Sequence, residues 1–261
     1  MAEQEIQKIG DKLLSMRGFV FPVMNKDILT PQDMDSLQTF QIRDDDVYVV
    51  TFPKSGTVWT QRIIALLHED EFPESVNQTS IDIMPWLEFP SYGTDHTTRR
   101  SPRLFTSHLP EHLVPRGLQG KGKIIYVTRN PKDIMVSYFH FSHYMKILER
   151  SETYNEVMEK FLSGRMVGGC WFDHIKGWYT NKDKYNILFL SYEEMIRDLR
   201  GAVVKICEFL GKNVSDELID SVVEKTSFNN MKKDPKANYE FLPDDVIDSG
   251  KGAFLRKGTQ E

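Results

Sequence analysis

Residues 47–67 carry the pattern of a strand, a tight loop and a helix in succession. The run Val47-Tyr-Val-Val-Thr-Phe52 is β-branched and aromatic, which is typical of a buried parallel strand. After it, Ile63, Ile64, Leu66 and Leu67 recur at helical spacing. The short loop Pro53-Lys-Ser-Gly-Thr57 separates the two. A strand that enters a helix through so short a loop is a building unit of α/β folds, so this stretch predicts that class.

The loop contains the groups that bind an anion. Gly56 lets the backbone approach a ligand, and the free N–H groups at a helix start point toward it. Lys54 adds a positive charge, while Ser55 and Thr57 add hydroxyl donors, so the loop suits a phosphate or sulfate group. The loop is not a Walker A sequence, because its lysine precedes its only glycine. The alternative interpretation is an ordinary turn whose Ser, Gly and Thr residues cap the helix.

Length and composition bound the remaining possibilities. A chain of 261 residues with 40% hydrophobic content and no linker or internal repeat predicts one α/β domain over residues 1–261. The net charge of −5 argues against a nucleic-acid partner. A polar N-terminus and the lack of a long apolar run predict a soluble, cytoplasmic protein without membrane contact. Cys170 and Cys207 stand in apolar contexts and are expected to be buried free thiols.

Further strands bring polar residues to the same edge of the predicted sheet. Residues 103–108 are expected to form a strand that ends at His108, where ligands bind in open α/β sheets. Residues 123–128 form a second clear strand, after which Asn130 can cap a helix that begins at Pro131. Arg129 therefore stands at a strand-to-helix corner. A P-loop enzyme would tend to carry a magnesium-binding Asp there, whereas an arginine binds an anion directly.

The other elements are predicted from periodicity and caps. Residues 185–190 are a third buried strand, and Ser191-Tyr-Glu-Glu194 has capping-box spacing, which places Tyr192 at that strand's end. An irregular loop is expected over 89–103, and an extended segment over 19–24. For Trp86 and Phe89, a place in the core and a place in the wall of a pocket are equally expected. Arg256-Lys257 could bind an anion or could be a charged chain end. Helices are predicted over residues 4–16, 134–144, 154–162, 171–180, 199–210 and 216–225.

Six separated motifs, in order along nearly the whole chain, resemble the cytosolic sulfotransferase family. They are Thr51-Phe-Pro-Lys-Ser-Gly-Thr-Val-Trp59, Ser107-His-Leu-Pro110, Arg129-Asn-Pro-Lys-Asp133 with Ser137-Tyr-Phe-His-Phe141, Ser191-Tyr-Glu-Glu194, Thr226-Ser-Phe228 and Arg256-Lys-Gly258. Together they are far more specific than any one of them. The resemblance implies a P-loop-like three-layer fold, in which helices flank a mostly parallel central sheet. It also implies transfer of a sulfuryl group from 3′-phosphoadenosine 5′-phosphosulfate (PAPS) to a small, mostly apolar phenol, alcohol, steroid or amine.

The resemblance assigns roles to matching positions. PAPS would be bound by Lys54, Ser55, Gly56, Thr57, Val58, Trp59, Arg129, Ser137, Tyr192, Thr226, Ser227, Phe228, Met231, Phe254, Leu255, Arg256, Lys257 and Gly258. Within this set the loop from Lys54 holds the phosphosulfate, the aromatic and neighbouring residues surround the adenine, and Arg129, Ser137 and 256–258 hold the 3′-phosphate. His108 matches the catalytic base, and Lys54 neutralises charge on the leaving phosphate. The acceptor is expected to contact Trp86, Phe89, Thr106, Ser107, His108 and Phe141.

Simple chemistry agrees with these roles. An imidazole with an unperturbed pKa of about 6.5 can accept the proton of an acceptor hydroxyl at neutral pH, and no divalent metal is needed for this transfer. Two separate cationic sites would favour a nucleotide with phosphate at both ends over ATP. We expect PAPS as the co-substrate and no metal.

The chain departs from the family pattern at three places. Thr106 stands where many members carry a lysine, and Val58 where a second threonine is frequent. The sequence ends at Thr259-Gln-Glu261, where the family usually continues into a dimer segment, so dimer formation through that segment is not expected. A non-catalytic PAPS-binding protein, inactivated by C-terminal shortening, is therefore the main alternative function. A P-loop nucleotide kinase is a weaker one, given the order of the loop and Arg129.

Overall fold

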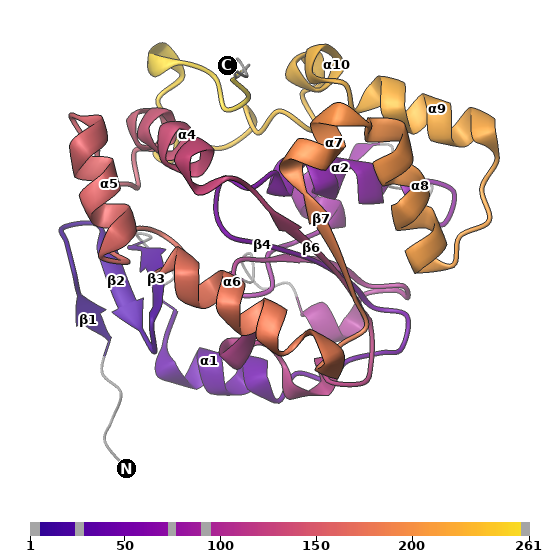
Figure 1. Ribbon diagram of the computed structural model, residues 1–261, viewed down its shortest axis with the longest axis horizontal. Helices are drawn as coiled ribbons and strands as arrows, with labels where there is room; N and C mark the ends of the chain where they lie inside the picture. The colour runs from indigo at the N-terminus through magenta and orange to yellow at the C-terminus, as the bar shows by residue number, and fades with distance from the viewer. Residues whose placement is uncertain (1–5, 24–28, 73–76, 90–94, 257–261) are drawn as a thin grey trace.

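A computed structural model describes residues 6–23, 29–72, 77–89 and 95–256, and its centre is a parallel sheet of four strands (Figure 1). The strands are β4 (Val47–Thr51), β5 (Leu104–Ser107), β6 (Lys123–Thr128) and β7 (Ile187–Ser191), in the order β5-β4-β6-β7. All three strand pairs are parallel. Every residue of β4 is buried, as its run of apolar residues predicts for a central strand.

Helices cover both faces of this sheet. Val47 and Val49 pack against α2 (Thr57–Leu67), α8 (Leu199–Leu210) and α9 (Asp216–Lys225). Tyr48 and Val50 face the other way, toward α1 (Pro31–Gln38) and α6 (Trp171–Thr180). Successive residues of one strand thus belong to two hydrophobic cores, because their side chains alternate across the sheet. The result is a three-layer α/β fold, as predicted.

The N-terminal residues form a small antiparallel sheet, and the helix predicted over residues 4–16 is wrong. The strands are β1 (Gln7–Lys8), β2 (Leu13–Met16) and β3 (Phe19–Pro22). Met16 pairs with Phe19 across a two-residue turn in which Arg17 and Gly18 have φ of 53° and 83°. Two successive positive φ angles match the twist of a hairpin and end any helix. The extended segment expected over 19–24 is confirmed as far as Pro22, and Met24 lies outside the described residues.

The other predicted helices and strands are confirmed within a few residues. Of the irregular loop expected over 89–103, residues 90–94 lie outside the described residues, and the remainder includes the 3-10 helix η2 (His96–Thr98). Asn130 caps α4 (Pro131–Tyr144), with Pro131 in its first turn, and Ser191 and Glu194 form the predicted capping box of α7 (Tyr192–Arg197). Cys207 is buried and Cys170 half-buried, and both are free thiols. None of the helices within the described ranges has the length and apolar character that a membrane crossing requires. The remaining elements are α3 (Ser80–Ile83), α5 (Tyr154–Leu162), α10 (Phe228–Lys233) and the short 3-10 helices η2 (His96–Thr98), η3 (Glu111–Leu113), η4 (Arg116–Leu118), η5 (Lys182–Lys184) and η6 (Ser249–Lys251).

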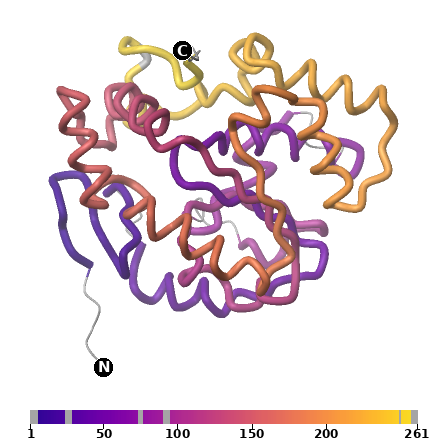
Figure 2. The backbone as a smooth tube through the Cα atoms, in the orientation of Figure 1, coloured from indigo at the N-terminus to yellow at the C-terminus, as the bar shows by residue number. Residues whose placement is uncertain are grey.

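The chain after α10 returns over α4 toward the loop that follows β4 (Figure 2). The Asp248 N–H donates to the Tyr144 carbonyl at 2.8 Å, and Met145 forms an isolated bridge with Ile247. Phe254 then packs edge-to-face against Phe141 of α4, with ring centroids 5.7 Å apart. The C-terminal segment therefore reaches the carboxyl edge of the sheet.

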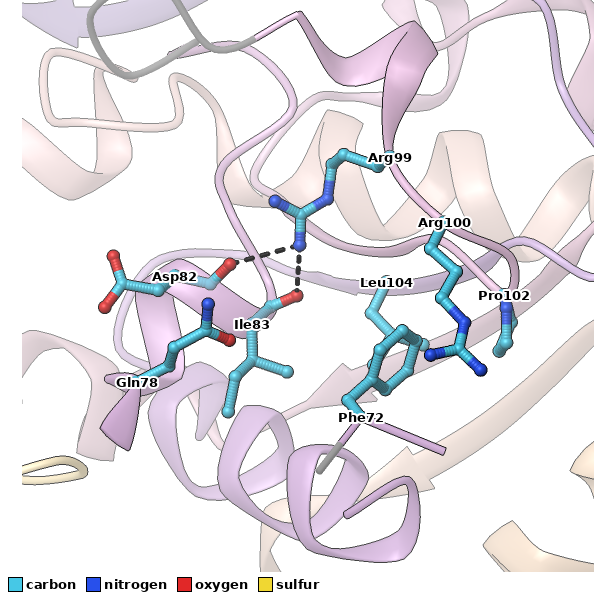
Figure 3. Close-up of a pocket in the computed structure, with 8 residues that line it drawn as sticks. All are labelled: Phe72, Gln78, Asp82, Ile83, Arg99, Arg100, Pro102 and Leu104. Carbon is cyan, nitrogen blue, oxygen red and sulfur yellow. Dashed lines mark hydrogen bonds between the residues drawn. The ribbon is translucent and has the colours of Figure 1, made fainter. Parts of the chain in front are cut away.

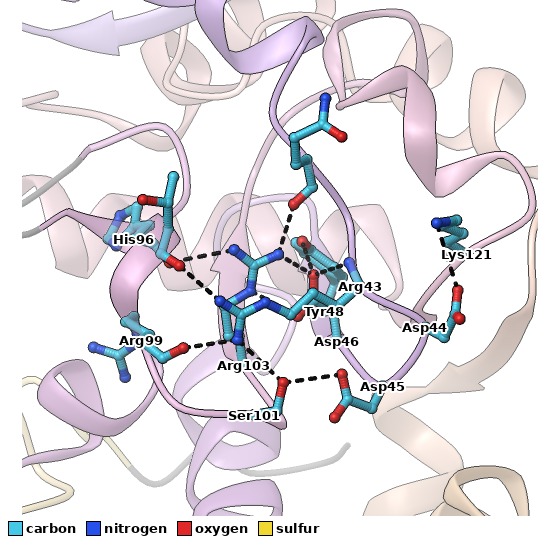
Figure 4. A network of polar contacts seen from close by, with 12 residues as sticks. Arg43, Asp44, Asp45, Asp46, Tyr48, His96, Arg99, Ser101, Arg103 and Lys121 are labelled. Carbon is cyan, nitrogen blue, oxygen red and sulfur yellow. Dashed lines mark hydrogen bonds and ion pairs between the residues drawn. The ribbon is translucent and has the colours of Figure 1, made fainter.

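At the opposite, amino-terminal edge of the sheet, a buried ion pair connects β4 and β5. Arg103, just before β5, donates to both carboxylate oxygens of Asp46, just before β4, at 2.8 and 2.6 Å (Figure 4). Both side chains are almost fully buried. The backbone N–H of Arg43 and the Tyr48 hydroxyl also donate to this carboxylate. These bonds tie the starts of the two strands together, at the end of the sheet away from His108.

Candidate active site

The predicted polar residues meet because four parallel strands end side by side. Thr51 pairs with Val127 and Thr128 pairs with Ser191, so β4, β6 and β7 end at the same level. The next residues along the chain are the loop after β4, Arg129 after β6 and Tyr192 at the start of α7. On the other side of β4, Val50 pairs with Ser107, which places His108 at this edge.

The loop between β4 and α2 has an unusual backbone. Lys54 has φ of 71° and Gly56 has φ of 104°, both in the left-handed region. A Cβ atom added to Gly56 would lie 2.8 Å from Cδ2 of Tyr192, so only glycine fits between this ring and the helix start. No side chain caps α2, and the Ser55 hydroxyl is buried with no hydrogen-bond partner in the described chain. These free donors fit a bound anionic group.

Two cations adjoin the loop, and neither has a carboxylate partner among the described residues. Nζ of Lys54 lies 3.7 Å from the Phe141 ring centroid and 4.8 Å from that of Phe254. Arg129 donates to the Lys54 carbonyl at 3.0 Å and stacks over Tyr192 at 4.0 Å, and its Nε is buried without a partner among the described residues. Burial lowers the pKa of Lys54 to about 7, helped by the positive charges of Arg129 and Arg256. Such crowded cations favour a bound anion, which would relieve their repulsion.

Aromatic and apolar residues flank the other side of the loop. Nε1 of Trp59 donates to the Thr226 carbonyl at 2.9 Å, and its ring lies edge-to-face on Tyr192 at 5.5 Å. Val58 packs in one cluster with Met231 and Leu255. Ser227 and Phe228 are half-buried at the start of α10. The structure thus gathers the residues predicted to surround the adenine.

His108 is held in one tautomer by the end of β4. Its Nδ1 lies 2.7 Å from the Thr51 carbonyl, which can only accept, so Nδ1 carries the proton and Nε2 keeps a lone pair. No residue in the described part of the chain hydrogen-bonds to Nε2. Burial lowers the pKa of His108 to about 4, and the positive charge of Lys54 adds to this against the opposing effect of the Thr51 bond. The imidazole is therefore neutral at pH 7, as a base must be.

Three residues that sequence reasoning missed surround this histidine. The Thr51 hydroxyl lies 3.2 Å from Nδ1 and 2.6 Å from the Thr57 hydroxyl, so it links the base to the loop. The His108 N–H donates to Oε1 of Glu88 at 2.6 Å, and its carbonyl lies 3.2 Å from Nε2 of His174. Glu88 could have been noticed as a charge within an apolar run, and His174 as a histidine one turn before the buried Trp178.

The predicted acceptor residues have different surroundings. Trp86 is half-buried with its ring centroid 4.5 Å from that of His108, and Phe141 lies beside Lys54. Phe89 packs on the core beneath β5. Thr106 and Ser107 are buried, and their hydroxyls bond within the protein: Thr106 donates to the Met84 carbonyl, and Ser107 accepts the Leu109 N–H.

The predicted 3′-phosphate residues are only partly described. Arg256 is exposed, but its charge lowers the pKa of Lys54, which places it near the loop. Ser137 is half-buried on α4, and no hydrogen bond within the described ranges joins it to Arg129. Lys257 and Gly258 lie outside the described residues.

A cavity of about 210 Å³ lies elsewhere, beside the start of β5 (Figure 3). Arg99 donates there to the carbonyls of Asp82 and Ile83, and Arg100 lies over the Phe72 ring at 5.9 Å. Its lining residues are Phe72, Gln78, Asp82, Ile83, Arg99, Arg100, Pro102 and Leu104. None of the predicted site residues is among them.

Known proteins are similar to this chain in sequence and in fold. Residues 44–261 match the family model described as the sulfotransferase domain. The chain is 46% identical to an amine sulfotransferase from Oryctolagus cuniculus, over 95% of this chain and 82% of that protein. It is 40% identical to a 3-beta-hydroxysteroid sulfotransferase from Cavia porcellus, over 96% of this chain and 87% of that protein. A crystal structure of mouse sulfotransferase SULT7A1 complexed with PAP superimposes with a TM-score of 0.70 and 32% identity, over 85% of this chain and 77% of that chain. A family match over most of the chain, together with these identities, means that the protein belongs to the sulfotransferase family and is a sulfotransferase.

Proposed function

We propose that the protein transfers the sulfuryl group of PAPS to the hydroxyl or amine of a small apolar acceptor, with His108 as general base. The observation that carries this proposal is the unprotonated Nε2 of His108, fixed by the Thr51 carbonyl next to an anion-binding loop. Thr51 contacts the histidine and, through its hydroxyl, Thr57 of that loop. Donor and base are thus positioned by one strand end.

The chain offers PAPS two kinds of contact. The phosphosulfate would be held by Lys54, Ser55, Gly56 and Thr57. The Ser55 hydroxyl and Arg129 Nε are buried, have no partner among the described residues, and would supply donors for anionic groups. Trp59, Tyr192 and Met231 would hold the adenine. Complexation of the mouse relative with PAP, adenosine 3′,5′-bisphosphate, supports this choice. PAPS supplies an activated sulfuryl group whose leaving phosphate gains negative charge, which Lys54 is placed to neutralise.

His108 takes the proton that the acceptor loses on attack. Its low pKa keeps it neutral across the physiological range, although it also makes it a weaker base. Part of that lowering comes from the charge of Lys54. An anion bound to Lys54 would offset this charge, so donor binding would strengthen the base.

The acceptor side is aromatic. The Trp86 ring lies against His108, and Phe141 lies beside Lys54 on α4. Such rings suit a phenol, a steroid or another flat apolar body whose hydroxyl or amine reaches Nε2. Relatives named for amines and for hydroxysteroids support an acceptor of this class.

The test is sulfuryl transfer from radiolabelled PAPS to a panel of phenols, hydroxysteroids and amines. We expect labelled product with the wild-type protein and a loss of about 10²- to 10⁴-fold in turnover for His108→Ala, the usual contribution of a general base. His112→Ala is the matched control, because His112 is exposed and lies outside the site. PAP binding without turnover on any acceptor, or equal turnover in His108→Ala and the wild type, would refute the proposal.

A further inference from the structure

The strand ladder beside β5 stops at His108. The segment before Phe89 adds to β5 as a parallel edge: the Thr106 N–H donates to the Pro85 carbonyl, and the Leu87 N–H donates to the Thr106 carbonyl, both at 2.9 Å. In a parallel ladder the next donor on β5 is the His108 N–H, and the next acceptor is the Leu87 carbonyl. The His108 N–H instead donates to Oε1 of Glu88 at 2.6 Å. A carboxyl side chain has replaced a backbone acceptor at this position.

This replacement is costly for the folded state. Glu88 has no exposed surface, and its Oε2 is buried with no hydrogen-bond partner within the described ranges. Burial raises the pKa of Glu88 to about 7, against the lowering effects of the His108 N–H, of the backbone of Glu88 itself and of the Ser107 hydroxyl. A buried carboxyl that is satisfied on one oxygen only destabilises a protein, whereas a backbone carbonyl would serve the same N–H without this cost. Its presence calls for a functional reason.

Because the backbone of His108 does not form the hydrogen bonds of the parallel strand pair, its orientation is set differently. A residue held in the ladder at both its N–H and its carbonyl would project its side chain perpendicular to the sheet. Here Glu88 binds the N–H, Nε2 of His174 meets the carbonyl, and the ring meets the Thr51 carbonyl at 2.7 Å. The backbone of His108 is thus fixed by two side chains, and the direction of its ring depends on their lengths.

Glu88 also follows Trp86 by two residues in the same segment. The ring centroid of Trp86 lies 4.5 Å from that of His108. The Glu88 bond therefore joins the segment that carries Trp86 to the backbone of His108.

We infer that Glu88 is a positioning residue for sulfuryl transfer: its Oε1 fixes the backbone of His108, and thereby directs Nε2 toward an acceptor held by Trp86. The inference rests on the proposed function, in which His108 is the base. Positioning of His108 requires a hydrogen-bond acceptor at the distance from the backbone that a glutamate side chain spans. The negative charge of Glu88 is dispensable.

Two substitutions separate reach from charge. Glu88→Gln keeps the side-chain length and an accepting oxygen but removes the charge, whereas Glu88→Asp keeps the charge and withdraws the oxygens by one methylene. We expect Glu88→Gln to retain kcat within about threefold and Glu88→Asp to lower it at least about tenfold, since small misplacements of a catalytic group are costly. The Kd for PAP, measured by calorimetry, should stay within about twofold in both, because Glu88 has no hydrogen bond to the loop among the described residues and bonds His108 instead. Glu111→Asp, at a half-buried carboxyl that accepts from Tyr185, is the matched control and should leave kcat unchanged.

A second readout does not depend on turnover. The imidazole nitrogen chemical shifts of His108, measured by NMR, report the Nδ1–H tautomer that the Thr51 carbonyl selects. They should match the wild type in Glu88→Gln and move in Glu88→Asp. Equal kcat in both variants, the opposite order, or a loss of PAP affinity that parallels kcat would each overturn the inference. Failure of the proposed function is distinct, because it appears as wild-type protein without turnover or as an active His108→Ala variant.

Discussion

Lys54 combines three features that rarely occur together in a lysine. Its φ of 71° lies in a region that non-glycine residues avoid, its ammonium group lies over two aromatic rings, and burial lowers its pKa to about 7. A strained backbone, of about 1–3 kcal/mol, persists where the surrounding structure requires it. Here the strain turns the Lys54 carbonyl to Arg129 and leaves the side chain beside the loop.

The lowered pKa of Lys54 predicts a pH dependence of nucleotide binding. Below about pH 7, Lys54 of the free protein is already protonated and carries the positive charge that attracts an anion. Above about pH 7, Lys54 is mostly neutral in the free protein, so it must take up a proton from solution when the nucleotide binds. The Kd for PAP should therefore rise by up to about tenfold per pH unit between about pH 7 and pH 9, a window above the phosphate ionisation near pH 6.

Calorimetry across this range gives the slope, and Lys54→Met provides the control. The methionine keeps the length of the side chain and cannot titrate, so its PAP affinity should be weaker and nearly independent of pH. A wild-type Kd that stays constant to pH 9, or a Lys54→Met profile with the wild-type slope, would show that Lys54 does not control the binding.

Individual residues differ in how far sequence could predict them. Lys54, Arg129 and His108 follow directly after apolar runs, and strand ends are where α/β sheets bind ligands, so their position follows from local pattern. By contrast, Glu88, Thr51 and His174 act through contacts with His108, which lies 20, 57 and 66 positions away from them along the chain, respectively. The register of β4 and β5 and the packing of α6 create those contacts. The sequence can therefore mark Glu88 and His174 as unusual residues, but it cannot show that they contact His108.

At the scale of elements, the helix start at Gly56 depends on the close approach of α7. Gly56→Ala introduces a Cβ atom 2.8 Å from the Tyr192 ring, at a backbone φ of 104° that alanine disfavours. We expect PAP affinity to fall at least about tenfold, because the ring and the loop must move apart and about 1.4 kcal/mol suffices for that factor. Calorimetric titration with PAP measures the change.

Gly120 provides the matched control for this element. Its φ of 121° is also positive, but a Cβ atom there would meet nothing within 4 Å. Gly120→Ala should lower the melting temperature through backbone strain and leave the Kd for PAP unchanged. If both alanine variants bound PAP as the wild type does, the contact with Tyr192 would have no role in shaping the loop.

The N-terminal hairpin shows why element prediction failed in one place. Apolar residues at helical spacing favoured a helix over residues 4–16, but Leu13 and Met16 pack into two different cores from a strand. The decisive signal was Arg17-Gly18, which both adopt positive φ and reverse the chain. By contrast α5, α6, α8 and α9 begin and end where the apolar periodicity predicted, since nothing competes with their local preference.

For the whole molecule, the two edges of the sheet have separate tasks. The carboxyl edge holds buried cations, a neutral imidazole and a buried carboxyl with one oxygen that has no hydrogen-bond partner in the described part of the chain, all of which cost stability. The amino edge holds the Asp46–Arg103 pair, in which the carboxylate and the guanidinium group each have several hydrogen-bond partners. Stability is thus provided at the edge that does not face the reaction, and damage to it should affect folding while sparing chemistry.

Asp46→Asn tests this division. The change leaves the buried Arg103 guanidinium without a counter-charge, which should lower the free energy of unfolding by about 3 kcal/mol, as breaking buried ion pairs does. Urea denaturation measures that loss, and Asp11→Asn is the control, because its pair with Lys8 is exposed and should contribute little. Below the unfolding transition, sulfuryl transfer by Asp46→Asn should match the wild-type rate, since no catalytic group contacts Asp46. A drop in kcat without a change in stability would mean that the amino edge communicates with His108 through β5, and that the two edges do not act independently.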